Sequence, residues 1–168
     1  MKKMNNKCIN NGCPLYEKGI KPLKLEKNNS EILLIFQAPG KIEWTKKAPI
    51  QKQESKSSAG WRIAKSWLRT GRKREEFDIT NIVLCYPGFN EKIKRDKKPN
   101  KKTINCCLEK LKKEIENNKY TKIICFGKIA RENICKIFPE NIKNLQIKTV
   151  RHPCGGLSNE ELDSLWAN

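Results

Sequence analysis

Short apolar runs alternate along the chain with segments of helical periodicity. Four runs rich in Ile, Leu, Val and Phe predict β-strands at residues 32–36, 77–84, 122–126 and 145–150. The first run (ILLIF) is apolar throughout and stops at Gln37-Ala38-Pro39-Gly40. Such a run is typical of a parallel strand that is covered on both faces.

Four further segments place apolar residues on one face of a helix. The clearest begins after Ser58, a favourable N-cap, and continues to about Thr70. The others lie at residues 104–115, at 129–138, and from about Ser158 onward, where Leu162, Leu165 and Trp166 share a face. Because strands and helices alternate, we expect residues 1–168 to form a single α/β domain. Its predicted architecture is a three-layer α/β/α sandwich with a short, mainly parallel central sheet of about four strands.

Three segments lack sustained periodicity. Residues 1–30 predict an irregular or briefly helical arm, residues 41–57 a polar loop, and residues 86–102 a long basic loop. Polar side chains lie toward the carboxyl ends of three of the predicted strands, namely Gln37, Asn81 and His152. The carboxyl ends of parallel strands meet at one edge of a sheet, where ligands gather, so these three positions are candidates for a shared site.

The charge of the chain favours a polyanionic partner. Its 168 residues include 36 Lys and Arg against 18 Asp and Glu, which gives a net charge of +18. Nucleic acid is therefore the leading partner, although basic charge does not distinguish DNA from RNA. A compositional bias of the source is an alternative explanation, because Ile, Lys and Asn are plentiful even in the loops. The sequence contains no run of eighteen apolar residues and no apolar signal-peptide core, so we expect a cytoplasmic protein without membrane association.

Eight cysteines are many for a reducing compartment, where disulfides rarely persist. Some of them are therefore expected to hold a metal ion or a cluster. A secreted disulfide scaffold is the alternative, and it requires a signal sequence that the N-terminus does not supply. Cys125 and Cys135 lie in apolar runs and are expected to be small core residues.

Seven colinear segments together carry a family resemblance. They are Cys8 and Cys13 followed by Pro14-Leu15, then FQAPGKIE, SAGWRI, ITNIVLCYPG, CCLEKLKKEI, IICFGKIA and RHP. Each is weak alone, but in this order they make nearly the whole chain resemble the iron-sulfur branch of the uracil-DNA glycosylases, often called family four. The resemblance implies a monomeric hydrolase of base-excision repair. Such an enzyme flips uracil or a related deaminated base out of DNA and hydrolyses its N-glycosidic bond, which leaves an abasic site.

The resemblance also implies a 4Fe-4S cluster. Its ligands would be Cys8, Cys13, Cys85 and Cys107. Cys107 is preferred over the adjacent Cys106 because its spacing to Leu111 and Ile115 matches the helix of the family. The four residues between Cys8 and Cys13 depart from the two that the family usually has, which leaves the geometry of the first pair open. The same four thiols are also suited to zinc, which we regard as the alternative.

The same resemblance assigns roles to residues at the strand ends. His152, the single histidine, would donate a hydrogen bond to uracil O2 as negative charge develops there, and Asn81 would read the O4 and N3-H edge. Gln37 stands where the family has an acidic residue, and an amide orients water but does not accept its proton. Glu43 matches a second acidic position and would supply charge if its segment folds inward; a solvated loop carboxylate is the alternative.

Further residues are expected to contact the flipped base or the duplex. Ala38, Pro39 and Gly40 would let the backbone approach the base closely. Ile50 stands where the family has a stacking phenylalanine, unless Trp44 fills that role. Leu157 would be the apolar wedge that replaces the extruded base, with a plain turn before the last helix as an equally good explanation.

Three departures favour a second hypothesis from another class. Gln37, Ile50 and Cys154 all differ from the family pattern, which has serine where Cys154 stands. The alternative function is a catalytically weakened or inactive iron-sulfur module that binds DNA with the same fold. A metal-binding RNA protein is a third interpretation of the charge and the cysteines.

Overall fold

A four-stranded parallel sheet forms the centre of the protein. The computed structural model describes residues 12–51, 56, 58–139 and 144–167. The strand order is β2-β1-β5-β6, with β1 at Ile32–Phe36, β2 at Asp78–Asn81, β5 at Lys122–Phe126 and β6 at Gln146–Val150. Phe36 pairs with Asn81, and Phe126 pairs with Val150. The residues that follow these strands therefore leave the sheet at one common edge.

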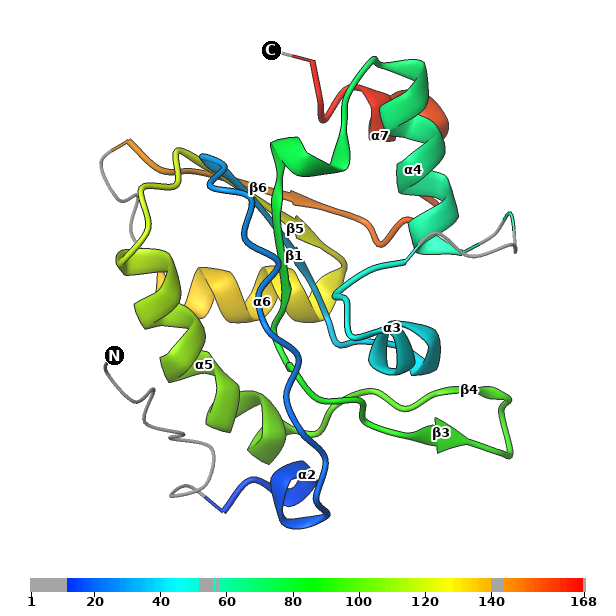
Figure 1. Cartoon of the computed structure of the whole chain (residues 1–168), viewed down its shortest axis with the longest axis vertical. Coiled ribbons are helices and arrows are strands. Elements are labelled where there is room, and N and C mark those ends of the chain that lie inside the picture. Colours follow the sequence, from blue (N-terminus) through cyan, green and yellow to red (C-terminus); the bar gives the residue numbers. More distant parts are fainter. Residues whose placement is uncertain (1–11, 52–55, 57, 140–143, 168) are drawn as a thin grey trace.

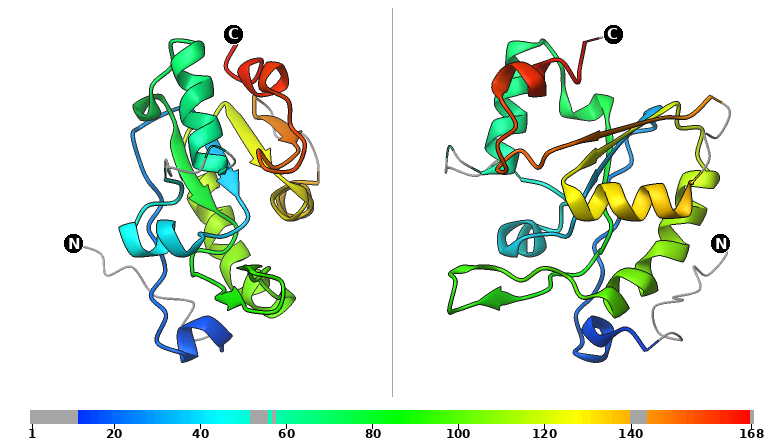
Figure 2. Two further views of the ribbon diagram at one scale, coloured as in Figure 1. Left: turned by 90° about the vertical axis from the view of Figure 1, so that its right-hand side faces the viewer. Right: turned by 180° about the vertical axis from the view of Figure 1, so that it is seen from behind.

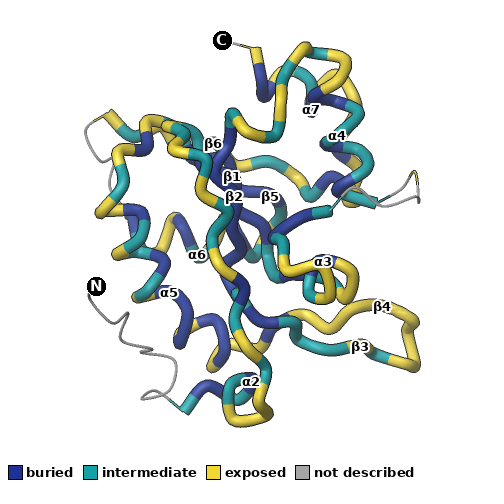
Figure 3. Tube along the Cα trace, in the orientation of Figure 1, coloured by how far each residue is buried: buried dark blue, intermediate teal, exposed yellow. Residues whose placement is uncertain are grey.

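Helices cover both faces of this sheet (Figures 1 and 2). On one face, Leu33 and Ile35 of β1 pack in a cluster with residues of α5 (Lys101–Glu116) and α6 (Lys128–Ile137). On the other face, Leu34 and Phe36 pack with residues of α4 (Ala59–Arg69) and α7 (Asn159–Asp163). Figure 3 shows the buried strands in the middle of the fold. This alternation confirms the predicted three-layer α/β/α sandwich.

Side-chain caps fix where the predicted helices begin. Ser58 accepts a hydrogen bond from the Trp61 backbone N–H, and Asn100 accepts one from Thr103. Helix α7 starts with a capping box at Ser158 but ends at Asp163. Leu165 and Trp166 therefore lie beyond the helix that was expected to carry them, although both remain buried. None of the helices within the described residues is both long and apolar enough to cross a membrane.

Three expected segments differ from the structure. The polar loop at 41–57 contains a short helix, α3 (Lys41–Lys46), and the basic loop at 86–102 contains an antiparallel hairpin of β3 (Phe89–Asn90) and β4 (Arg95–Asp96). The hairpin extends from the body of the molecule (Figure 1). The second strand is shorter than the predicted 77–84. Elements of two to six residues are too short to show a hydrophobic period, and tertiary contacts hold them in place.

The N-terminal arm is briefly helical, as predicted, and then follows the outer edge of the sheet. Helix α2 covers Pro14–Glu17. Further along, Glu26 forms an antiparallel bridge with Ile79 of the edge strand β2. The Glu26 carboxylate also pairs at 2.6 Å with Arg74, the first residue of the 3-10 helix η1 (Arg74–Glu76). These contacts pair the exposed edge of β2 with residues from its own chain.

Candidate active site

A cavity of about 400 Å³ lies at the carboxyl ends of the strands. It brings together seven residues to which the sequence assigned a role in the site, and Cys154 also lines it. The seven are Gln37, Ala38, Pro39, Gly40, Glu43, Ile50 and His152. Ser58 and Ala59 at the start of α4, and Asp96 and Lys97 of the hairpin, complete much of the remaining wall. A pocket of this size in this place is suited to a small ligand.

The segment after β1 forms one wall of the cavity. Its backbone is fixed because the Phe36 and Gln37 carbonyls accept hydrogen bonds from the N–H groups of Ile82 and Val83, at 2.8 and 3.1 Å. The Phe36 ring stacks on Phe126 with ring centroids 4.7 Å apart, and Phe36 is among the lining residues. Phe36 was not predicted as a site residue, because its position in an apolar strand indicates only a role in the core.

Glu43 points inward, toward the cavity. It lies on α3, is only 7% exposed, and accepts a hydrogen bond through Oε1 from the Gln51 N–H at 3.3 Å. A methyl group placed on Gly40 would lie 2.7 Å from Glu43 Oε2, so the glycine allows this close approach. The alternative of a solvated loop carboxylate does not describe the position found here.

Asn81 lies behind the cavity wall. Its side chain is 1% exposed, and Nδ2 donates a long hydrogen bond of 3.4 Å to the carbonyl of Pro49, a lining residue. Asn81 Oδ1 is one of two buried side-chain atoms in the described part of the chain that lack a hydrogen-bond partner. A buried unpaired acceptor costs about 1–3 kcal/mol, so an atom of this kind calls for an explanation such as a bound ligand, a water molecule or stored strain.

His152 is held as a neutral ring. Its Nδ1 accepts a hydrogen bond from the Cys154 backbone N–H at 3.2 Å, so Nε2 carries the proton. Burial lowers the pKa of His152 from 6.5, which favours the neutral form. The ring packs against Gly127, where an added methyl group would lie 3.3 Å from the His152 Cβ. The imidazole is therefore suited to donate one hydrogen bond from Nε2.

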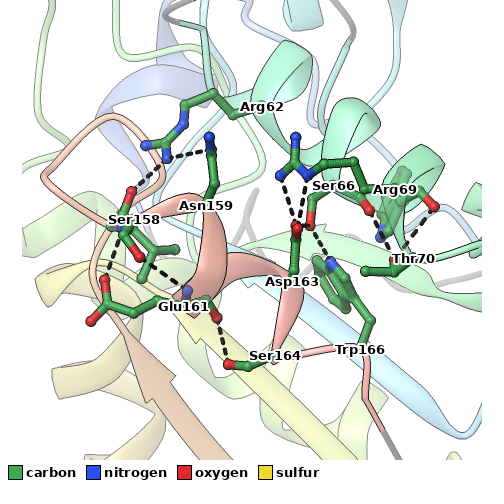
Figure 4. A network of polar contacts seen from close by, with 12 residues as sticks. Arg62, Ser66, Arg69, Thr70, Ser158, Asn159, Glu161, Asp163, Ser164 and Trp166 are labelled. Carbon is green, nitrogen blue, oxygen red and sulfur yellow. Dashed lines mark hydrogen bonds and ion pairs between the residues drawn. The ribbon is translucent and has the colours of Figure 1, made fainter.

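Arg62 of the SAGWRI segment fixes the loop that follows His152. Its guanidinium donates to the carbonyls of Pro153 and Leu157 and to Asn159 Oδ1. Figure 4 shows Arg62 reaching from α4 toward the start of α7. The loop is thus attached to the neighbouring helix rather than to the sheet alone.

The two residues proposed to contact the base or the duplex through apolar surface differ in position. Ile50 lines the cavity and is 4% exposed, while Trp44 is absent from the lining residues and has Lys47 Nζ 4.7 Å from its ring centroid. Leu157 is also 4% exposed and belongs to the core cluster beside α4 and α7. Its position favours the turn explanation over a wedge that projects into DNA.

Two residues of the hairpin were not anticipated. Asp96 and Lys97 line the cavity, and the Tyr86 hydroxyl donates to Asp96 Oδ1 at 2.8 Å. Burial, and secondarily this hydrogen bond, raises the pKa of Tyr86 to about 12, so its hydroxyl stays protonated at neutral pH. The sequence offered no signal for this arrangement, because the hairpin lies in a segment without periodicity.

Three of the four expected cluster ligands lie in the described part of the chain. Cys13, Cys85 and Cys107 are 2–3% exposed and belong to one apolar cluster, which also contains Cys106. Buried thiols are the donors that an iron-sulfur cluster requires. Cys8 lies outside the described residues. Among the residues that are described, no group of three or more His, Cys, Asp or Glu side chains is arranged to hold a metal ion.

The fold and the cavity define an α/β protein with a ligand site at the carboxyl edge of a parallel sheet. The chain that forms it is strongly basic. Residues 23–167 match the family model of the Uracil DNA glycosylase superfamily. The chain belongs to this superfamily, whose members act on DNA. A comparison with curated proteins gave no match.

Proposed function

We propose that this protein is a DNA glycosylase that extrudes uracil, or a related deaminated base, and hydrolyses its N-glycosidic bond. The observation that carries the proposal is the cavity that joins His152 to the segment Gln37–Gly40. It lies within the matched residues 23–167 and has the volume for one base. The product would be an abasic site, which is the substrate of the later steps of base-excision repair.

Asn81 is proposed to select the base. A carboxamide presents one acceptor and one donor side by side, which matches the N3-H and O4 of uracil and mismatches cytosine. Its unpartnered Oδ1 supports this role, because a uracil N3-H would satisfy that buried acceptor. Asn81 is 1% exposed and does not itself line the cavity, so the role requires Pro49 to shift as the base enters. The Pro49 carbonyl holds the amide by one Nδ2 hydrogen, which leaves the second hydrogen of Nδ2 for O4.

His152 is proposed to stabilise the leaving group. As the C1′–N1 bond breaks, its electron pair moves onto the base and negative charge develops on O2. The neutral imidazole would donate from Nε2 to that oxygen, an interaction worth about a hundredfold or more in rate inside a dry pocket. Gln37 would orient the attacking water through its amide.

The charge distribution supports a nucleic acid as the polymer that carries the base. A second hollow borders His152 on the side of α6, and Lys128, Arg131 and Arg151 are among its lining residues. Basic side chains beside the pocket are placed to meet the phosphates that flank an extruded nucleotide. Affinity should accordingly fall steeply as the salt concentration rises.

A cleavage assay tests the proposal. The protein is incubated with a labelled oligonucleotide that contains one uracil, and alkali then breaks the strand at any abasic site. Scission by the wild type and its loss in His152→Ala are expected. The variant Asn81→Ala should lose preference for uracil over cytosine. Asn133→Ala is a control, since Asn133 lies on α6 and bonds to the Ile129 carbonyl.

A catalytically weakened or inactive DNA-binding module remains the second candidate function. The observation that favours it is the neutral Gln37 at the position where the resemblance to the iron-sulfur branch implies an acid. Binding of uracil-containing DNA without scission of any deaminated base would support this candidate. Competition between DNA and RNA at fixed salt addresses the third interpretation, an RNA protein.

We also propose that Cys8, Cys13, Cys85 and Cys107 hold a 4Fe-4S cluster. The support is the burial of Cys13, Cys85 and Cys107 in one apolar cluster that joins the arm to the start of α5. A bound cluster would link segments that share little core of their own. No step of the base-release chemistry depends on it.

A further inference from the structure

Two carboxylates approach Gly40 inside the cavity. A methyl group placed on this glycine would lie 2.7 Å from Glu43 Oε2 and 2.9 Å from Asp96 Oδ2. Both residues line the cavity together with Gln37 and His152. The pocket therefore contains carboxylates from two other segments, although its expected acidic position is occupied by a neutral glutamine.

Asp96 is held in place more firmly than its position on a hairpin suggests. It pairs with Phe89 across the hairpin, and the next residue, Lys97, donates its N–H to the Gly88 carbonyl at 2.8 Å. The Tyr86 hydroxyl holds Asp96 Oδ1 at 2.8 Å. With one oxygen fixed in this way, the other oxygen, Oδ2, is left facing Gly40.

The two carboxylates differ in their access to solvent. Glu43 is 7% exposed and already accepts a backbone hydrogen bond from Gln51. Asp96 is an exposed residue. A group that removes a proton from water must pass that proton on to bulk solvent before the next turnover, and an exposed carboxylate does so more readily than a buried one.

We infer that Asp96 is the general base of the reaction and replaces the acid that Gln37 lacks. This inference rests on the proposed glycosylase function. The C1′–N1 bond breaks with its electron pair leaving on the base, and the water oxygen forms a new bond to C1′. The water proton goes to the Asp96 carboxylate and then to solvent, while the released base anion takes a proton from solvent. Gln37 orients the water, and Tyr86 is a positioning residue.

The variant Asp96→Asn tests this role without removing the side chain. Asparagine keeps an oxygen that accepts from the Tyr86 hydroxyl, but it does not accept a proton from water. Under single-turnover conditions with excess protein, the rate of uracil release should fall by about a hundredfold. Affinity for an oligonucleotide with a tetrahydrofuran abasic-site analogue should stay the same or increase, because a negative charge near the DNA is lost.

Three further variants separate catalysis from structure. Glu91→Gln removes the same charge from the turn of the same hairpin, where Glu91 pairs with Lys94 at 3.1 Å, and should leave the rate unchanged. Tyr86→Phe should lower the rate by less than Asp96→Asn, because the carboxylate remains. Adding Gln37→Glu to Asp96→Asn should restore much of the lost rate, since it returns a carboxylate to the pocket.

The possible outcomes are distinct. If the wild type releases uracil in a His152-dependent manner but Asp96→Asn is as fast, the assignment of Asp96 is wrong and the glycosylase function stands. If Asp96→Asn is slow only because it binds DNA less well, or Gln37→Glu does not restore activity, Asp96 has a structural role. If the wild type releases no base at all, both the function and this inference are overturned.

Discussion

The Cys154 backbone N–H donates a hydrogen bond of 3.2 Å to Nδ1 of His152. This contact fixes which ring nitrogen carries the proton, because a nitrogen that accepts a hydrogen bond cannot also be protonated. The replacement of serine by Cys154, which the sequence presented as a departure, does not alter the contact, since it is made by the backbone. The remaining donor, Nε2, is the atom on which the proposed chemistry depends.

The pKa of His152 should lie below 6.5 in the folded protein because burial disfavours the charged ring. His152 is the only histidine, so its ring signals are directly assignable in a proton NMR titration. The same titration in denaturant should give a value near 6.5. Base release should accordingly keep its rate as the pH falls to 6.5 and decline only below it.

The lowered pKa of His152 also makes the free energy of unfolding depend on pH. As the pH falls below 6.5, the unfolded chain takes up a proton that the folded chain does not, so the free energy of unfolding should decrease. His152→Gln should remove this contribution, as measured by urea denaturation at several pH values. A folded-state pKa at or above 6.5 would contradict the neutral-donor role.

Gly127→Ala should displace His152. Gly127 has φ 89° and ψ 169°, a region that is essentially restricted to glycine, so the substitution should lower the free energy of unfolding by about 1–3 kcal/mol. The new methyl group would also press on the His152 Cβ at 3.3 Å. We expect a loss of base-release rate that is larger than the loss of folded protein explains.

Gly71→Ala is the matched control for this substitution. Gly71 also has positive φ, at 68°, but a methyl group there would meet nothing within 4 Å. It should cost stability without slowing the folded enzyme. Equal losses of rate in both variants would show that backbone strain, not contact with His152, is responsible.

Arg62→Ala should release the loop after His152. The guanidinium donates to the Pro153 and Leu157 carbonyls, and its removal leaves both without that donor. Because small misplacements of catalytic groups are costly, the single-turnover rate should fall by about tenfold or more. Lys65→Ala removes the same charge from the same helix, where Lys65 lies over the Trp61 ring, and should have little effect. Similar losses in the two variants would indicate a role in DNA attraction only.

Ser66→Ala should destabilise the packing of α4 against the C-terminal segment. The Ser66 hydroxyl is fully buried; it donates to Asp163 Oδ1 and accepts from Trp166 Nε1 at 2.7 Å (Figure 4). Its loss leaves a buried indole N–H unpaired, at a cost of about 1–3 kcal/mol in urea denaturation. Ser164→Ala, at an exposed hydroxyl that bonds to the Glu161 carbonyl, should be close to neutral.

Substitution of Cys107 should abolish the proposed cluster, whereas substitution of its neighbour should not. Protein purified without oxygen should be brown, with a broad shoulder in the blue part of the visible spectrum. Cys107→Ala should lose this absorbance together with iron and sulfide, and Cys106→Ala should keep them, although both thiols are buried. Colourless wild-type protein that contains zinc would favour the alternative metal.

Much of the architecture was readable from the sequence. The apolar run at 32–36 and the N-cap at Ser58 each predicted an element within a residue or two of its observed bounds. The strand ends at Gln37 and His152 were expected to meet, and the cavity joins them, because parallel strands bring their carboxyl ends to one edge. Asn81 also lies at this edge but behind the wall, held through Pro49.

Other features depended on contacts between distant parts of the chain. Helix α3 and the hairpin are too short for their pattern to be recognised, and their positions bring Glu43 and Asp96 to Gly40. The burial of Leu157 likewise follows from packing against α4 and α7. Local propensity acts over a few residues, whereas these positions are set by interactions spanning tens of residues.

The sequence by itself determined the layered α/β fold and the residue types available for the site, because hydrophobic periodicity and helix caps act locally. Only the tertiary structure decided which carboxylates enter the pocket and which nitrogen of His152 keeps its proton. Those properties arise from burial and from hydrogen bonds made across the fold, and neither is encoded in the spacing of residues along the chain.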